Sequence, residues 1–138
     1  MKVLVTGSKG FIGKNLLLKL ISKKKYQIYE FNRGDSLKKL SNLIHEVDII
    51  FHTAGVNRST KKNFFISNNI NLTNKIVTLV NQKKTKTKVI FTSTDLINKK
   101  SISEYATTKL KAENLIKKRL LKIYDYQIFR LPNIFGKW

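Results

Sequence analysis

Short apolar runs alternate along the chain with longer segments in which apolar residues recur every three or four positions. The compact runs, rich in β-branched and aromatic residues, predict buried strands, and the helical spacing predicts amphipathic helices. The predicted strands cover residues 2–6, 26–31, 48–54, 87–94 and 126–131. The predicted helices cover residues 12–21, 36–44, 63–82 and 105–124.

This alternation predicts an α/β fold built from βαβ units, with a parallel sheet and helices on both of its faces. We expect a Rossmann-type, doubly wound sheet of about five strands in the order 3-2-1-4-5. Ligands of such sheets bind beyond the carboxyl ends of the strands, here near the first and fourth. The length of 138 residues, 41% of them hydrophobic, fits a single NAD(P)-binding domain over residues 1–138.

Composition narrows the chemistry that the domain can carry out. Cysteine is absent, which excludes disulfides, thiolate metal sites and a cysteine nucleophile. His45 is assigned to the surface and His52 to the core, and neither is arranged with carboxylates, so no metal site is predicted. The first apolar run breaks at Gly7 and is too short for a signal peptide or a membrane span. We therefore expect a cytoplasmic protein without a membrane partner.

The formal net charge of +20 raises the question of nucleic-acid binding. Only four of the 28 basic residues are arginine, the residue that nucleic-acid sites use for bidentate and stacking contacts. The lysines are dispersed along helical faces, which is typical of a solvated surface. No nucleic-acid partner is predicted.

The stretch GSKGFIG, residues 7–13, connects the first predicted strand to the first helix. In this context glycines are typical of a dinucleotide-binding turn. Gly7 would form the tight turn, Gly10 would let the backbone approach a pyrophosphate, and Gly13 would let the helix pack on the strand. The amides at the helix N-terminus would then face the anion.

The end of the second strand bears on the choice between NAD and NADP. An NAD site places an acidic residue there to bind the ribose hydroxyls, whereas this chain has Asn32 and Arg33, with Glu30 expected to point elsewhere. A cation beside a neutral amide suits a 2′-phosphate, and Lys9 could add to the charge. NADPH is therefore expected as the cofactor rather than NADH.

A second candidate site combines Thr94, at the end of the fourth strand, with Tyr105 and Lys109. The i, i+4 spacing puts the phenol and the ammonium on one helix face, where the cation would lower the tyrosine pKa. Tyr105 would transfer a proton, Thr94 would orient the substrate oxygen, and Lys109 would also hold the cofactor ribose. The pair Phe64–Phe65 is assigned to the core.

Five stretches in this order, GSKGFIG, HTAG, TST, YATTK and RLPNIFG, resemble extended short-chain dehydrogenases/reductases, the nucleotide-sugar epimerase/dehydratase superfamily. KGFIGKNL, HTAGVNR and RLPNIFGKW resemble more narrowly the N-terminal reductase domain of CapF/WbjC-type capsular polysaccharide enzymes. Those enzymes act in UDP-N-acetyl-L-fucosamine synthesis. The resemblance implies reduction of the C4 keto group of a UDP-linked 4-keto-6-deoxy sugar by NADPH.

The resemblance also implies roles for individual residues. Thr94, Tyr105 and Lys109 would be catalytic, and Asn133 would lie near the sugar. The residues that would line the cofactor are Gly7, Gly10, Gly13, Arg33, Ala54, Gly55, Lys109 and Pro132. Asn57 and Arg58 match a family stretch without an assigned role. Dehydratase relatives carry Asp-Glu after the catalytic threonine, whereas Asp95-Leu96 stands here, which favours a reductase.

The resemblance implies relatives that continue well beyond Trp138 into a substrate-binding lobe. We therefore expect the chain to be an N-terminal portion that lacks this lobe. A homodimer or a complementing chain could supply it. Two alternatives stay open: a fragment that binds dinucleotide without turnover, and an NAD(P)-dependent nucleotide-sugar epimerase or dehydratase.

Overall fold

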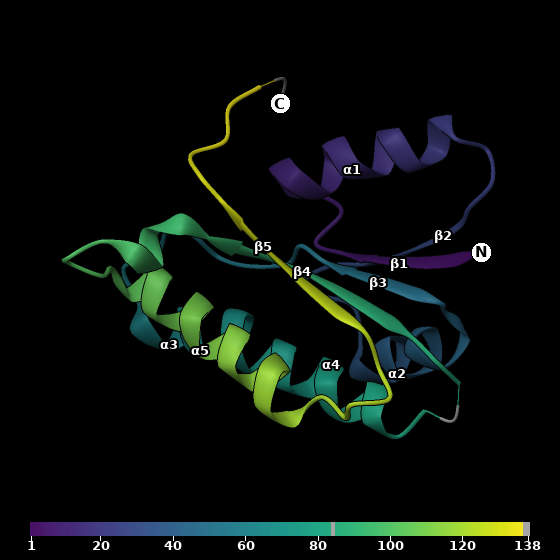
Figure 1. Ribbon diagram of the computed structural model, residues 1–138. Helices are drawn as coiled ribbons and strands as arrows, with labels where there is room; N and C mark the ends of the chain where they lie inside the picture. The colour runs from purple at the N-terminus through teal and green to yellow at the C-terminus, as the bar shows by residue number, and fades with distance from the viewer. Residues whose placement is uncertain (84, 137–138) are drawn as a thin grey trace.

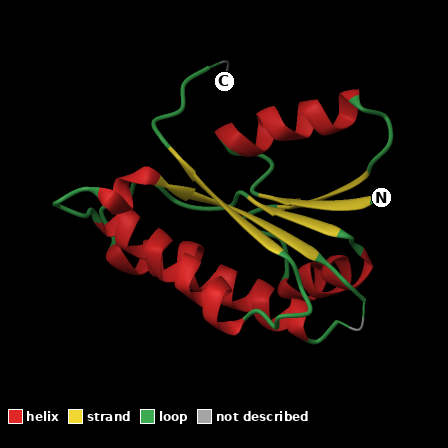
Figure 2. Ribbon diagram, in the orientation of Figure 1, coloured by secondary structure: helices red, strands yellow, loops and turns green. Residues whose placement is uncertain are grey.

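The computed structural model describes residues 1–83 and 85–136, so Lys137 and Trp138, the end of the RLPNIFGKW stretch, lie outside the described residues. A central sheet carries helix α1 (Phe11–Ser22) on one face and the remaining helices on the other (Figures 1 and 2). The strands are β1 (Lys2–Thr6), β2 (Gln27–Phe31), β3 (Ile49–His52), β4 (Lys88–Thr94) and β5 (Tyr126–Leu131). The helices of the second face are α2 (Leu37–Glu46), α3 (Lys62–Phe65), α4 (Leu72–Asn81) and α5 (Glu104–Arg119).

All four strand pairings are parallel, which confirms the predicted α/β class. The strand order is β2-β1-β3-β4-β5, so the expected order 3-2-1-4-5 is wrong. The chain crosses over β1 between β2 and β3, and β3 pairs with β1 through Val3 and Ile49. The switch in strand order therefore lies between β1 and β3.

Burial explains why β3 takes the central position. Ile50 and His52 of β3 have no exposed surface, whereas β2 exposes Gln27 and Glu30, as an edge strand does. The crossover brings the carboxyl ends of β1 and β3 side by side. The candidate site is built on this junction.

Two predicted helices differ from the observed ones. The segment predicted as one helix over 63–82 is α3 and α4 joined by a π-helical stretch, η1 (Ile66–Asn71). The helix predicted over 105–124 ends at Arg119. The chain then turns so that Leu120 and Tyr124 are buried, and the Tyr124 hydroxyl donates a hydrogen bond to the Lys83 carbonyl.

The core is unequal on the two faces of the sheet. The larger cluster packs α2, α4 and α5 against the sheet, around Leu4, Ile50 and Phe91. The smaller one lies beneath α1 and contains Val3, Val5 and Leu20. Burial of this apolar area is the main stabilising contribution to the domain.

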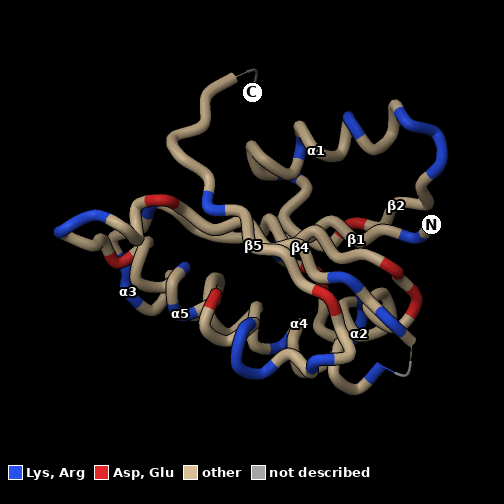
Figure 3. Tube along the Cα trace, in the orientation of Figure 1, with Lys and Arg blue, Asp and Glu red and all other residues tan. Residues whose placement is uncertain are grey.

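Basic residues are spread over the helices of both faces and over the loops, as the blue segments of Figure 3 show. None of the described helices is long and apolar enough to cross a membrane. Strand β5 lies at the open edge of the sheet and leaves Tyr126 and Phe129 about half exposed, at 42% and 49%.

Candidate functional site

The glycine turn after β1 is set by two close approaches. Gly7 has a φ of 71°, and a Cβ there would lie 2.6 Å from the Cα of Ala54, in the loop just after β3. At Gly13 a Cβ would lie 2.2 Å from the Gly7 carbonyl oxygen, so only glycine lets α1 begin this close to β1. Gly10 is the N-cap of α1 and supplies no side-chain hydrogen bond to its first turn. The first amides of the helix are thus available to an anion.

A first cavity, of about 350 Å³, lies at the carboxyl ends of β1, β2 and β3. Its wall includes Gly7, Lys9, Asn32, Arg33 and Ala54. The exposed Arg33 guanidinium lies over the Phe64 ring, 4.8 Å from its centre. Phe64 is 37% exposed, so its assignment to the core is wrong, whereas Phe65 is buried.

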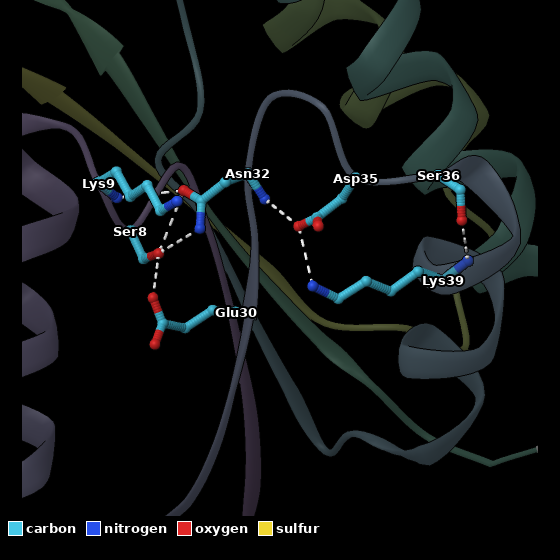
Figure 4. A network of polar contacts seen from close by, with 7 residues as sticks. All are labelled: Ser8, Lys9, Glu30, Asn32, Asp35, Ser36 and Lys39. Carbon is cyan, nitrogen blue, oxygen red and sulfur yellow. Dashed lines mark hydrogen bonds and ion pairs between the residues drawn. The ribbon is translucent and has the colours of Figure 1, made fainter.

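The polar network beside this cavity occupies both nearby carboxylates (Figure 4). Glu30 accepts a hydrogen bond of 2.5 Å from the Ser8 hydroxyl. Asp35 accepts a hydrogen bond of 2.8 Å from the backbone amide of Asn32 and forms an ion pair with Lys39 at 2.9 Å. At the end of β2 the cavity wall is therefore formed by the neutral side chain of Asn32 and the cationic side chain of Arg33.

A second cavity, of about 740 Å³, brings together residues from distant parts of the sequence. The start of α1 forms one side, through Gly10 and Gly13, and the loops after β3 and β5 form others. The predicted site residues on its wall are Gly10, Gly13, Gly55, Thr94, Tyr105, Lys109, Pro132 and Asn133. Gly7, Arg33 and Ala54 lie on the wall of the first cavity, which shares Gly10 and Gly55 with the second.

Thr94, at the end of β4, is buried, and its hydroxyl oxygen accepts a hydrogen bond of 3.3 Å from the amide of Leu96. This contact begins the short 3-10 helix η2 (Asp95–Asn98) and fixes the side chain. The hydroxyl keeps its own proton for donation into the second cavity.

Tyr105 and Lys109 lie one turn apart on α5, and burial dominates the pKa of both. Burial raises the pKa of Tyr105, so the expectation that Lys109 would lower it is wrong for this structure. Burial lowers the pKa of Lys109 to about 7, against a smaller opposing effect of Glu113. The Lys109 ammonium lies 4.1 Å from the centre of the Phe91 ring.

Asn69, which no pattern in the sequence indicates as a site residue, lies in η1 and is 2% exposed. Its Oδ1 accepts a hydrogen bond of 2.8 Å from the Val56 amide, and its Nδ2 donates to the Val56 carbonyl and the Thr108 hydroxyl at 3.0 Å. Asn69 therefore connects the loop after β3 to the helix that carries Tyr105 and Lys109. A π-helical turn, frequent at functional sites, is a signal that only the structure displays.

His52 is fully buried, as predicted, and its hydrogen bonds define its tautomer. Thr73 donates to the Asn69 carbonyl, so its oxygen accepts from His52 Nε2 at 2.9 Å. Nδ1 then accepts from the Thr6 hydroxyl at 2.8 Å. Burial and, to a smaller extent, Lys109 lower the pKa of His52 to about 3, so the ring is neutral and structural.

A second group that the sequence does not indicate, the ion pair of Glu113 and Arg130, joins α5 to β5. Glu113 is fully buried and receives two hydrogen bonds from Arg130, at 3.0 and 2.8 Å, and one from Lys117 at 3.2 Å. Burial alone would raise the pKa of Glu113, but the hydrogen bonds outweigh it and lower the pKa to about 2. The pair holds β5 in place directly before Pro132 and Asn133.

Comparison with known proteins places this geometry in a family. Residues 3–138 match the model of the NAD dependent epimerase/dehydratase family. The chain belongs to this family. Over its whole length it is also 39% identical to a protein of Pseudomonas aeruginosa named UDP-2-acetamido-2,6-beta-L-arabino-hexul-4-ose reductase. It spans 37% of the length of that relative.

Several solved structures share the fold of this chain. The capsular polysaccharide assembling protein CapF of Staphylococcus aureus has a TM-score of 0.81 at 26% identity, and the match covers the whole chain and 36% of CapF. The UDP-glucuronic acid 4-epimerase of Bacillus cereus, solved in complex with NAD, has a TM-score of 0.82 at 22% identity, over 99% of this chain and 57% of the epimerase. All three relatives are longer than this chain, which spans 36–57% of their lengths.

Proposed function

We propose that this chain forms the cofactor-binding and catalytic part of an NADPH-dependent reductase that acts on the C4 keto group of a UDP-linked 4-keto-6-deoxy sugar, in surface-polysaccharide synthesis of the UDP-N-acetyl-L-fucosamine type. One observation carries the proposal. The second cavity joins the glycine turn to Thr94, Tyr105 and Lys109. The 39% identity to a UDP-sugar reductase supports this choice of substrate.

The glycine turn fits a dinucleotide, because a Cβ at Gly7 or Gly13 would clash with the backbone that forms the cradle. The amides of the first turn of α1 would hold the diphosphate, and Lys109 would bind the nicotinamide ribose. Gly55, beside Lys109, and Pro132 would border the nicotinamide. Bound NADPH would supply the hydride.

Tyr105 would donate a proton to the carbonyl oxygen as the C4 hydroxyl forms. Its raised pKa keeps the phenol protonated at neutral pH, which is the form that reduction requires. The Thr94 hydroxyl would donate a hydrogen bond to the same oxygen and hold the carbonyl in position.

NADPH is proposed over NADH because of the charges around the first cavity. The carboxylates of Glu30 and Asp35 are held by Ser8, Lys39 and the Asn32 backbone. Arg33, by contrast, has no carboxylate partner within residues 1–83 and 85–136. Its guanidinium can bind a 2′-phosphate through its N–H groups while its plane stacks on the Phe64 ring.

Titration with NADPH and NADH, followed by nicotinamide fluorescence, tests the proposal. We expect NADPH to bind more tightly than NADH. Arg33→Asp should weaken the affinity for NADPH by about 10- to 100-fold, because a charged hydrogen bond is lost. Lys38→Asp, an exposed change of the same charge on α2, is the control. No binding of NADPH at high micromolar concentration would reject the proposal.

A second candidate is dinucleotide binding without turnover, favoured by the 37% of the relative's length that the chain spans. Most contacts to the nucleotide sugar would then come from a further segment, a homodimer or a complementing chain. Binding of NADPH without its oxidation by the UDP-4-keto sugar would support this second candidate.

A further inference from the structure

Arg58 lies in the loop after β3 and has no role in the reaction proposed above. Among the described residues its guanidinium makes no hydrogen bond, ion pair or ring contact. Each of the other three arginines has a partner in the protein: Arg33 with Phe64, Arg119 with Asn74, and Arg130 with Glu113. The planar fork of Arg58 is therefore available to a ligand.

A third cavity, of about 780 Å³, lies between this loop and the start of α5. Asn57, Arg58, Leu96 and Tyr105 border both this cavity and the second one. A molecule that reacts at Tyr105 can thus extend into the third cavity, away from the glycine turn that would hold the cofactor.

The third cavity is suited to an anion. Its one carboxylate, on Glu104, is paired with Lys62 at 3.0 Å, which leaves the charge of Arg58 uncompensated. The N-terminus of the 16-residue helix α5 adds its positive dipole end to the same wall, through Ser103 and Glu104. Thr60 contributes a hydroxyl.

We infer that Arg58 binds the diphosphate of the sugar nucleotide, an assignment that rests on the proposed function. With the keto carbon beside Tyr105, the sugar ring extends towards the third cavity and places its phosphates at the guanidinium. Paired N–H groups of arginine match two phosphate oxygens. The substrate and cofactor diphosphates then occupy opposite sides of Tyr105.

The test is calorimetric titration of UDP and of uridine into the protein saturated with NADPH, so that UDP does not bind at the cofactor site. UDP is expected to bind more tightly than uridine. Arg58→Ala is expected to weaken the affinity for UDP by about 10-fold or more. Arg58→Lys should weaken it by less, because lysine keeps the charge but lacks the paired N–H groups of the guanidinium. Lys61→Ala, an exposed neighbour outside the cavity wall, is expected to leave the affinity unchanged.

Equal UDP affinity of the wild type and Arg58→Ala would overturn the assignment, as would UDP binding no tighter than uridine. Lack of UDP binding to the NADPH-loaded wild type would overturn it too. In each of these results NADPH still binds, so the cofactor-binding part of the proposed function is not contradicted. Failure of the wild type to bind NADPH would reject the proposed function itself.

Discussion

At the scale of single residues, burial favours the neutral form of both reactive groups on α5. The pKa of Tyr105 is raised and that of Lys109 is lowered to about 7, so the phenol is protonated and the amine about half charged at neutral pH. A protonated tyrosine suits reduction rather than oxidation, which needs a base.

Tyr105→Phe removes this proton donor and little else, because the ring keeps its packing. We expect turnover to fall by about 10²- to 10⁴-fold, the usual contribution of a general acid. The affinity for NADPH should change less than twofold. Tyr126→Phe, on the exposed edge of β5, serves as the control. A Tyr105→Phe variant with full activity would refute the role of the phenol.

His52 should stay neutral far below the pH at which an exposed histidine titrates. Its folded pKa of about 3 lies below the ordinary 6.5, so its contribution to stability is complete above pH 6.5 and declines as the pH falls towards 3. Nitrogen-15 NMR should show the Nε2–H tautomer down to about pH 4. A His52 ring that becomes protonated near pH 6 would contradict the hydrogen-bond assignment.

At the scale of elements, the π-helical stretch η1 directs Asn69 into the core, where one side chain satisfies both polar groups of Val56. An uninterrupted α-helix would rotate this side chain relative to α3. The local irregularity thus determines how the loop after β3 lies against α5.

Asn69→Ala should lower the free energy of unfolding by about 1–3 kcal/mol, because the buried amide and carbonyl of Val56 lose their partners. Urea denaturation measures this change. Asn71→Ala, an exposed position in the same stretch, should change stability by less than about 0.5 kcal/mol. Equal effects of the two substitutions would show that the network is not a stabilising one.

Glu113 joins α5 to β5, and its charge makes the stability of the domain depend on pH over a defined range. Its folded pKa of about 2 lies below the ordinary value of 4.5, so its contribution to stability is complete above pH 4.5 and is lost as the pH falls towards 2. In urea denaturation, Glu113→Gln should lower the stability at pH 7 and flatten the decline below pH 4.5. Glu46→Gln, on the surface, should leave that decline unchanged.

At the scale of the whole molecule, the net charge of +20 should attract anionic ligands over a distance set by salt. We expect the Kd for NADPH to rise several-fold between about 20 and 500 mM NaCl. Binding of adenosine, which is uncharged, should be insensitive to salt. A salt-independent Kd for NADPH would show that local hydrogen bonds, rather than the overall field, determine the affinity.

Most of the elements were predictable because periodicity and turn residues are local properties. The strands between residues 2 and 131 and the glycine turn lie where the sequence predicts them. The strand order was not predictable from periodicity, since it depends on which side of β1 the third strand packs. The polar residues of β2, in contrast to the apolar residues of β3, were the available signal.

The candidate site was likewise predictable only in part. Residue types and spacing along the chain predict a glycine turn at Gly7–Gly13 and a tyrosine and lysine on one helix face. They carry no information on contacts between residues far apart, such as Asn69 with Val56 or Glu113 with Arg130. Those contacts, and the burial that shifts the pKa of Lys109, arise only when the sheet and helices close around them. Desolvation depends on neighbours in space, and the order of residues does not specify these directly.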